Sequence, residues 1–202
     1  MYSRSIFKMT ETDCLMLIEQ QPFGLLTTCR DERITQAFLP FLIDKSRNCL
    51  YGHLAKNNQQ IAALEDPADL KVTFQGTHSY ISPNWYESLE QVPTWNYLAV
   101  EVQGAVTLLD SKGTLKVITD LSNKHESPFE KPWTMDKLSE KKTNVMLKAI
   151  VGFRINISAI SGINKMSQNK NNKDIKGVLA GLLNQPDQAS KGVAKIMFKR
   201  KG

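Results

Sequence analysis

The chain has 202 residues, 41% of them hydrophobic and 23% charged, with a net charge of +6, a composition that excludes a chain disordered throughout. No apolar run reaches the roughly 18 residues of a membrane-spanning helix, and the N-terminus lacks the apolar stretch of a signal peptide. Three cysteines without a CxxC pair argue against a disulfide framework and a zinc site. We therefore expect a cytoplasmic protein without membrane contact or bound metal.

The first half of the chain is expected to hold one helix and several short strands. Thr10 can cap a helix that ends near Gln20. Apolar runs at residues 23–29 and 34–38, joined by polar residues 30–33, predict a β-hairpin. Further strands are predicted at residues 41–43, 49–53 and 70–76, with a short helix at residues 55–64.

The second half begins with the longest expected strand, residues 95–108, in which Gly104 interrupts an apolar face as at a barrel corner. Short strands separated by turns, together with helices around them, predict an α+β fold built on a small β-barrel. The remaining elements are helices at residues 114–124 and 135–149, a core strand at residues 151–157, and a C-terminal helix at residues 175–182.

We expect one domain at residues 1–162 and a basic loop and helical extension of the same domain at residues 163–202. This extension carries nine Lys or Arg against Asp174 and Asp187, a net charge of +7, whereas the remainder carries −1. Such a segment is typical of proteins that bind DNA or a phosphate-bearing ligand. A solvated helical face with a basic tail is the alternative, and no helix-turn-helix is evident.

Four polar segments are candidates for a ligand site. In residues 51–58, Gly52 permits close backbone approach where a helix is expected to start, which suits a phosphate. In residues 74–86, polar and aromatic side chains alternate and could contact a planar ring. Trp95 and its neighbours at residues 92–97, and the polar run 165–170, complete the set. Taken alone, such segments more often have an ordinary structural role, and none identifies a catalytic residue.

Motifs of several common enzymes are absent, since the sequence has no P-loop, GxGxxG, HExxH or GxSxG. The four polar segments together resemble the PaiB-like family of FMN-binding transcriptional regulators, from about residue 1 to residue 182. The matching strings are GHLAKNN at residues 52–58, FQGTHSYISPNWY at 74–86, VPTWNY at 92–97, AIVGF at 149–153 and KMSQNK at 165–170, with Gly177, Val178, Gly181 and Leu182 closing the pattern.

This resemblance implies a split β-barrel like that of pyridoxamine-phosphate oxidase, a bacterial homodimer with FMN at the subunit interface, and negative regulation of transcription. It implies that the flavin phosphate lies near His53, Lys56 and Asn57. The other implied flavin contacts are Gln75, Trp95 and Asn96 for the ring or ribityl chain, and Lys165, Ser167 and Gln168 from the C-terminal loop.

The chain departs from the family pattern at three positions. Phe38 and Glu101 stand where a histidine is usual, and Ile61 stands where a tryptophan is usual, so two polar rings of the family's ligand site are replaced. Two rival functions stay open: a flavin-dependent oxidoreductase acting on a small substrate, and a ligand-free split barrel acting through DNA or protein contacts.

Overall fold

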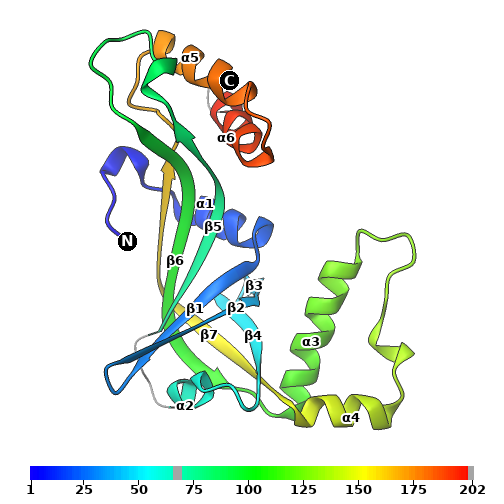
Figure 1. Cartoon of the computed structure of the whole chain (residues 1–202). Coiled ribbons are helices and arrows are strands. Elements are labelled where there is room, and N and C mark those ends of the chain that lie inside the picture. Colours follow the sequence, from blue (N-terminus) through cyan, green and yellow to red (C-terminus); the bar gives the residue numbers. More distant parts are fainter. Residues whose placement is uncertain (66–69, 200–202) are drawn as a thin grey trace. The chain divides into compact units, whose positions relative to one another are not determined.

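A seven-stranded sheet and six α-helices make up the computed structural model of the chain, which describes residues 1–65 and 70–199 (Figure 1). The strand order is β2-β1-β5-β6-β7-β4-β3, and β1 pairs antiparallel with β2 and β5, as does β4 with β3 and β7. The strands are β1 Phe23–Arg30, β2 Arg33–Pro40, β3 Leu42–Asp44, β4 Cys49–Ala55, β5 Leu70–Ile81, β6 Thr94–Leu108 and β7 Ile150–Lys165.

The helices follow the expected order along the chain. None of them, within the described residues, is long and apolar enough to cross a membrane. They are α1 Glu11–Gln20, α2 Gln60–Glu65, α3 Ser111–Glu126, α4 Glu140–Lys148, α5 Asn172–Leu183 and α6 Gln188–Lys199, with 3₁₀ turns at Ser5–Phe7, Pro83–Trp85 and Met135–Lys137.

The predicted helix cap and hairpin are confirmed, and their chemistry explains them. The Thr10 hydroxyl oxygen accepts a hydrogen bond from the Asp13 backbone N–H at 3.1 Å, so it caps α1. Between β1 and β2, Asp31 and Glu32 have φ values of 48° and 62°. Two successive left-handed residues are typical of the two-residue turn that matches the twist of a hairpin.

Two local predictions are wrong. The helix predicted at residues 55–64 begins only at Gln60, because β4 continues to Ala55 and a turn follows. The loop expected after residue 76 is a strand as far as Ile81, where alternate residues are buried. The polar run at residues 165–170, for which no conformation was predicted, begins at the end of β7, and Ser167 has a φ of 57°, which folds the chain into a tight turn.

The chain divides into two compact units. One comprises Met1–Cys14, Gln75–Val100 and Ser161–Gly202, and the other comprises Leu15–Phe74 and Glu101–Ile160. We call them unit 1 and unit 2. The sequence-based boundary between residues 162 and 163 stays a prediction, and Arg200 and Lys201 of the basic segment lie outside the described residues.

Unit 2 is built around three fully buried aromatic rings. Phe41 packs edge-on against Phe74 and Phe153, with ring centroids 5.5 and 6.2 Å apart. Gly24 lies under this cluster, where a Cβ atom would come within 2.7 Å of the Phe74 ring. The absence of a side chain at residue 24 therefore lets β1 approach the core closely.

Unit 1 contains α5 and α6, which lie side by side (Figure 1) and bury an apolar seam. The buried Asp174 carboxylate accepts hydrogen bonds from the backbone N–H groups of Glu87 and Ser88, at 3.0 and 2.9 Å. These bonds lower the pKa of Asp174, the backbone N–H of Ser88 most strongly. Trp85 packs directly on Gly181 of α5, where a Cβ atom would overlap its ring.

Candidate functional site

Two adjoining cavities lie in unit 2 where β4 ends and β7 begins. The first, which we call the apolar cavity, has a volume of about 540 Å³. The second, which we call the lysine cavity, has a volume of about 380 Å³, and both are lined by Ile150. The apolar cavity is lined by His53, Ile118, Leu121, Trp133, Met135 and Met146, and the lysine cavity by Lys56, Lys148, Ser111, Thr114 and Asn144.

Strand register places the predicted residues of β4 at this point. His53 pairs with Gly152 of β7, and Ala55 pairs with Ile150. The start of α3 rests on Gly152, whose backbone N–H donates to the Thr114 hydroxyl at 3.1 Å. A Cβ atom at residue 152 would lie 3.0 Å from the Thr114 Cα, so glycine there allows α3 to cover these strands.

His53 presents an unsatisfied polar atom in the apolar cavity. Its Nδ1 is buried and has no hydrogen-bond partner among the described residues. Burial lowers the pKa of His53, so its imidazole is neutral near pH 7. A buried polar atom without a partner is costly, and a polar ligand in this cavity would supply the missing hydrogen bond.

The loop between α3 and α4 contributes the aromatic wall of the apolar cavity. Glu126 at the end of α3 accepts a hydrogen bond from the Trp133 backbone N–H at 2.8 Å. This bond fixes the loop, so that Trp133 and Met135 line the cavity opposite the strands. Sequence reasoning missed Trp133, because it lies between Pro132 and a predicted helix with no motif around it.

Lys56 does not lie at a helix start as predicted, because α2 begins four residues later. It lies in the turn after β4, where its backbone N–H donates to the Ala149 carbonyl at 2.8 Å. That bond brings it beside the end of α4, and Lys148 from α4 lines the same cavity. The lysine cavity is therefore lined by two lysines and by the hydroxyl groups of Ser111 and Thr114. Asn57 is exposed in the same turn.

The other predicted site residues lie in unit 1, where most are engaged with neighbours. The Asn96 amide donates to the Ser167 hydroxyl at 2.9 Å and accepts from it at 3.2 Å, and both residues are buried. Gln168 accepts from the Met166 backbone N–H and donates to the carbonyls of Ile6 and Asn164.

The three remaining predicted residues of unit 1 lie on strands. The Lys165 ammonium donates to the Thr94 hydroxyl, and burial lowers the Lys165 pKa. The Gln75 amide lies 3.3 Å from His78 Nδ1. Trp95 is half exposed and lies beside the rings of His78 and Tyr80 in a third cavity, of about 320 Å³.

The positions that depart from the family pattern have structural roles of their own. Phe38 stacks on Phe23 with ring centroids 5.8 Å apart. Glu101 forms an ion pair with Lys71 at 3.5 Å, and Ile61 is half-buried on α2. The part of the chain that the structure describes contains no group of three or more His, Cys, Asp or Glu residues arranged to hold a metal ion.

The antiparallel sheet with its helices is the α+β split barrel of flavin-binding proteins. The chain resembles the flavocytochrome Anf3 of Azotobacter vinelandii with a TM-score of 0.61, over 81% of this chain and 72% of that one, at 11% identity. Residues 1–159 match the family described as "Putative FMN-binding domain". The chain therefore belongs to this family, and its cofactor is FMN.

Relatives with curated names span almost the whole chain. The protease synthase and sporulation protein PAI 2 of Bacillus subtilis is 35% identical over 98% of this chain and 96% of its own length. An uncharacterized protein of the fungus Emericella nidulans is 30% identical over 99% of this chain and 97% of its own length. The family is thus present in both bacteria and fungi.

The adjoining cavities fit FMN on the chemistry of their linings. The apolar cavity offers an aromatic wall and the unpartnered His53 Nδ1, which suits a planar ring with polar edges. The lysine cavity offers Lys56, Lys148 and the hydroxyls of Ser111 and Thr114, which suit a phosphate. The end of β4 and the turn after it connect the two, because His53 lies near the end of the strand and Lys56 begins the turn.

Proposed function

We propose that the chain binds FMN in the two adjoining cavities of unit 2 and acts as an FMN-dependent regulator of transcription. In this arrangement the flavin ring lies in the apolar cavity against Trp133 and His53, and the phosphate lies in the lysine cavity beside Lys56 and Lys148. The observation that carries the proposal is the buried, unpartnered His53 Nδ1 in an apolar cavity that adjoins a lysine-lined one. When bound, the flavin supplies any redox chemistry, while the protein positions it.

The remaining sequence-based contacts stay predictions. Asn57 is the best placed of them, because it is exposed in the same turn as Lys56. The amide of Asn96 and the hydroxyl of Ser167 would have to give up their mutual hydrogen bonds to reach a ligand, and the Gln168 side chain would have to give up its own. Gln75 and Lys165 each have one side-chain hydrogen-bond contact, with His78 and Thr94, and Trp95 is half exposed.

The test of the flavin site compares FMN with riboflavin, which has the ring but lacks the phosphate. Lys56→Ala is expected to weaken FMN binding about tenfold, because one charge-assisted hydrogen bond is lost, and to leave riboflavin binding within about twofold. Binding is measured by quenching of flavin fluorescence. Lys173→Ala removes an exposed lysine outside both cavities and should alter neither affinity. Equal losses for the two flavins would place Lys56 away from the phosphate.

Regulation is supported by the name of the Bacillus subtilis relative and by the charge of α6. Lys191, Lys195 and Lys199 recur every four residues, so they form an exposed stripe on one face of this helix. None of the three has an ion-pair partner among residues 1–65 and 70–199. Such a stripe suits the phosphate backbone of DNA.

The DNA proposal is tested by fluorescence anisotropy with a labelled duplex at two salt concentrations. The triple variant with alanine at Lys191, Lys195 and Lys199 should bind all sequences more weakly, with a log–log salt slope shallower by up to about 0.9 per lost phosphate contact. An unchanged salt slope would show that these three lysines make no contact with DNA phosphates. Bleaching of bound FMN by NAD(P)H would instead favour the oxidoreductase alternative.

Homodimer formation is supported by an apolar patch on the β1–β2 hairpin. Phe23, Ile34 and Phe38 are 62%, 68% and 67% exposed, and the two phenyl rings stack on each other. Ile34 lies on the same face of β2 as Phe38, with the exposed Gln36 between them. Large exposed apolar side chains such as the stacked phenyl rings are typical of interfaces. Sedimentation at micromolar concentration should show a dimer that Phe38→Asp dissociates, and a monomeric wild-type protein would refute this part of the proposal.

A further inference from the structure

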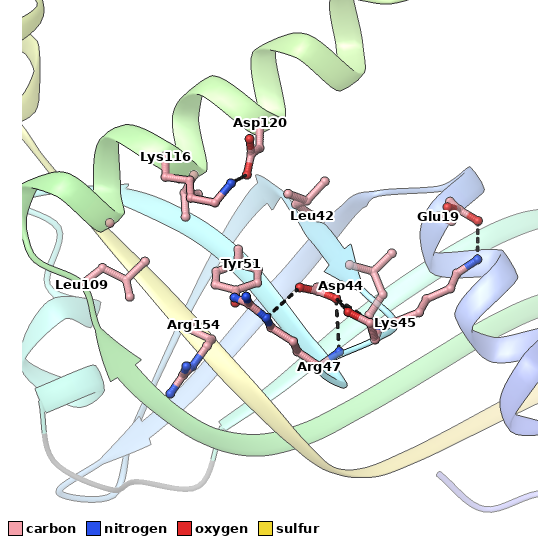
Figure 2. Close-up of a pocket in the computed structure, with 14 residues that line it drawn as sticks. Glu19, Leu42, Asp44, Lys45, Arg47, Tyr51, Leu109, Lys116, Asp120 and Arg154 are labelled. Atoms are coloured by element: carbon pink, nitrogen blue, oxygen red, sulfur yellow. Dashed lines mark hydrogen bonds and ion pairs between the residues drawn. The ribbon is translucent and has the colours of Figure 1, made fainter.

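A third cavity of unit 2, with a volume of about 700 Å³, lies among the β3–β4 hairpin, β7 and α3 (Figure 2). Unlike the lysine cavity, it is lined by carboxylates as well as cations. We call it the basic cavity. It is lined by four cationic and three anionic side chains, together with aliphatic residues that include Leu42 and Val117, and the ring of Tyr51. Leu109 lines both this cavity and the lysine cavity.

Three of the four cations are paired with carboxylates of the same cavity wall. These pairs are exposed, and exposed ion pairs contribute little free energy, so a ligand can displace them readily. They are Lys45 with Glu19 (Nζ to Oε2, 2.6 Å), Lys116 with Asp120 (Nζ to Oδ2, 2.8 Å) and Arg47 with Asp44 (Nε to Oδ2, 3.7 Å).

Arg154 is the fourth cation that lines the basic cavity. It lies on β7 directly opposite Tyr51 of β4. Its Nε is buried without a hydrogen-bond partner, and the described residues provide no carboxylate within ion-pair distance of its guanidinium. Among the described residues, no carboxylate of this cavity wall balances the charge of Arg154.

Hydrogen bonds to Asp44 hold the β3–β4 turn, which carries two of the basic residues of the cavity. The Asp44 carboxylate accepts hydrogen bonds from the hydroxyl and backbone N–H of Ser46 and from the backbone N–H of Arg47, at 2.7, 3.1 and 3.2 Å. Arg47 also donates to the Tyr51 hydroxyl, which raises the pKa of the guanidinium. The backbone that carries Arg47 is therefore fixed by the protein itself.

We propose that the basic cavity binds a small organic anion, with its carboxylate or phosphate at Arg154 and its apolar or planar body against Tyr51 and the aliphatic wall. Carboxylates and phosphates share the geometry that a guanidinium recognises. The wall is apolar enough to contact the rest of such a molecule, and the excess positive charge favours an anion over a neutral ligand of the same shape. The chain would then hold a second ligand besides FMN.

The test uses the full-length protein saturated with FMN and isothermal titration calorimetry. The probes are phenyl phosphate, phenylacetate and neutral benzyl alcohol, which share a ring and differ in charge. At least one anion should bind ten times more tightly than benzyl alcohol, and the comparison between the two anions identifies the preferred group. Arg154→Gln should weaken that anion about tenfold and leave FMN affinity within twofold.

Lys116→Ala and Lys173→Ala are matched variants, because the two lysines are 72% and 75% exposed and each pairs with one carboxylate at 2.8 and 2.9 Å. Only Lys116 lines the basic cavity, so only its removal should weaken the anion, by about threefold. This pair keeps the test decisive even if Arg154→Gln fails to fold. The proposal is overturned if benzyl alcohol binds as well as the anions, if both lysine variants behave alike, or if Arg154→Gln releases FMN, since the basic cavity would then belong to the flavin site.

Discussion

The turn after β4 and the turn after β7 are equally polar in sequence, yet their side chains have different roles in the structure. After β4, Lys56 borders a cavity, Asn57 is exposed, and His53 Nδ1 has no partner among the described residues. After β7, Ser167 is bonded to Asn96, and Gln168 satisfies one backbone N–H and two carbonyls. Both stretches match the same family pattern.

The difference shows that a run of polar residues in the sequence does not by itself distinguish side chains that bind a ligand from side chains that stabilise the fold. A left-handed residue such as Ser167 leaves neighbouring backbone groups unpaired, and nearby side chains must satisfy them because buried polar groups need partners. The turn after β4 satisfies its backbone by pairing Lys56 N–H with Ala149. Its side chains therefore remain available to a ligand.

The largest expected effect tests the structural role of the second turn. Asn96→Ala leaves the buried Ser167 hydroxyl without its partner, so the free energy of unfolding should fall by about 1–3 kcal/mol. Urea denaturation of the purified protein measures this change, and flavin fluorescence measures FMN affinity. A loss of FMN affinity with unchanged stability would make Asn96 a ligand contact and remove the contrast between the turns.

Much of the fold follows from the sequence because hydrophobic periodicity and turn chemistry are local. The hairpin of β1 and β2 and the capped helix α1 follow from patterns within about ten residues. The extent of β5 and β7 does not, because their later residues alternate polar and apolar side chains as a loop also can. Only pairing with strands distant in sequence determines where such segments end.

The candidate site was only partly accessible from the sequence. His53 and Lys56 were identified through a contiguous string, whereas Trp133 lies 80 residues after His53 in a loop and Lys148 lies 92 residues after Lys56 in a helix. No local pattern indicates that α3 rests on Gly152 and thereby brings α4 to the end of β4. The basic cavity is equally hidden, because Arg47, Lys116 and Arg154 are separated by long stretches of chain.

A smaller effect concerns the pH dependence that the unpartnered His53 imposes. Burial places its folded-state pKa below the unfolded value of about 6.5. The unfolded chain then binds more protons between these two pKa values, so stability rises with pH across that window and is lost as the pH falls below about 6.5. His53→Gln should flatten this dependence in urea denaturation of the FMN-free protein at pH 5.5, 6.5 and 7.5. Identical slopes in both proteins would assign the effect to other groups.

The smallest expected effect belongs to Asn57, an asparagine in the turn after β4. It is compared with Asn96, whose amide is bonded to the turn after β7. Because Asn57 is exposed, Asn57→Ala should change the free energy of unfolding by less than about 0.5 kcal/mol. If its amide contacts the flavin phosphate or ribityl chain, FMN affinity should fall by about threefold to tenfold, as expected for one hydrogen bond of about 0.5–1.5 kcal/mol. Comparing FMN with riboflavin locates the contact, since a phosphate contact affects FMN alone. If neither affinity changes, Asn57 does not contact the flavin, and Lys56 is the polar side chain of this turn that does. The contrast between the two turns then rests on Lys56 and on His53 of β4.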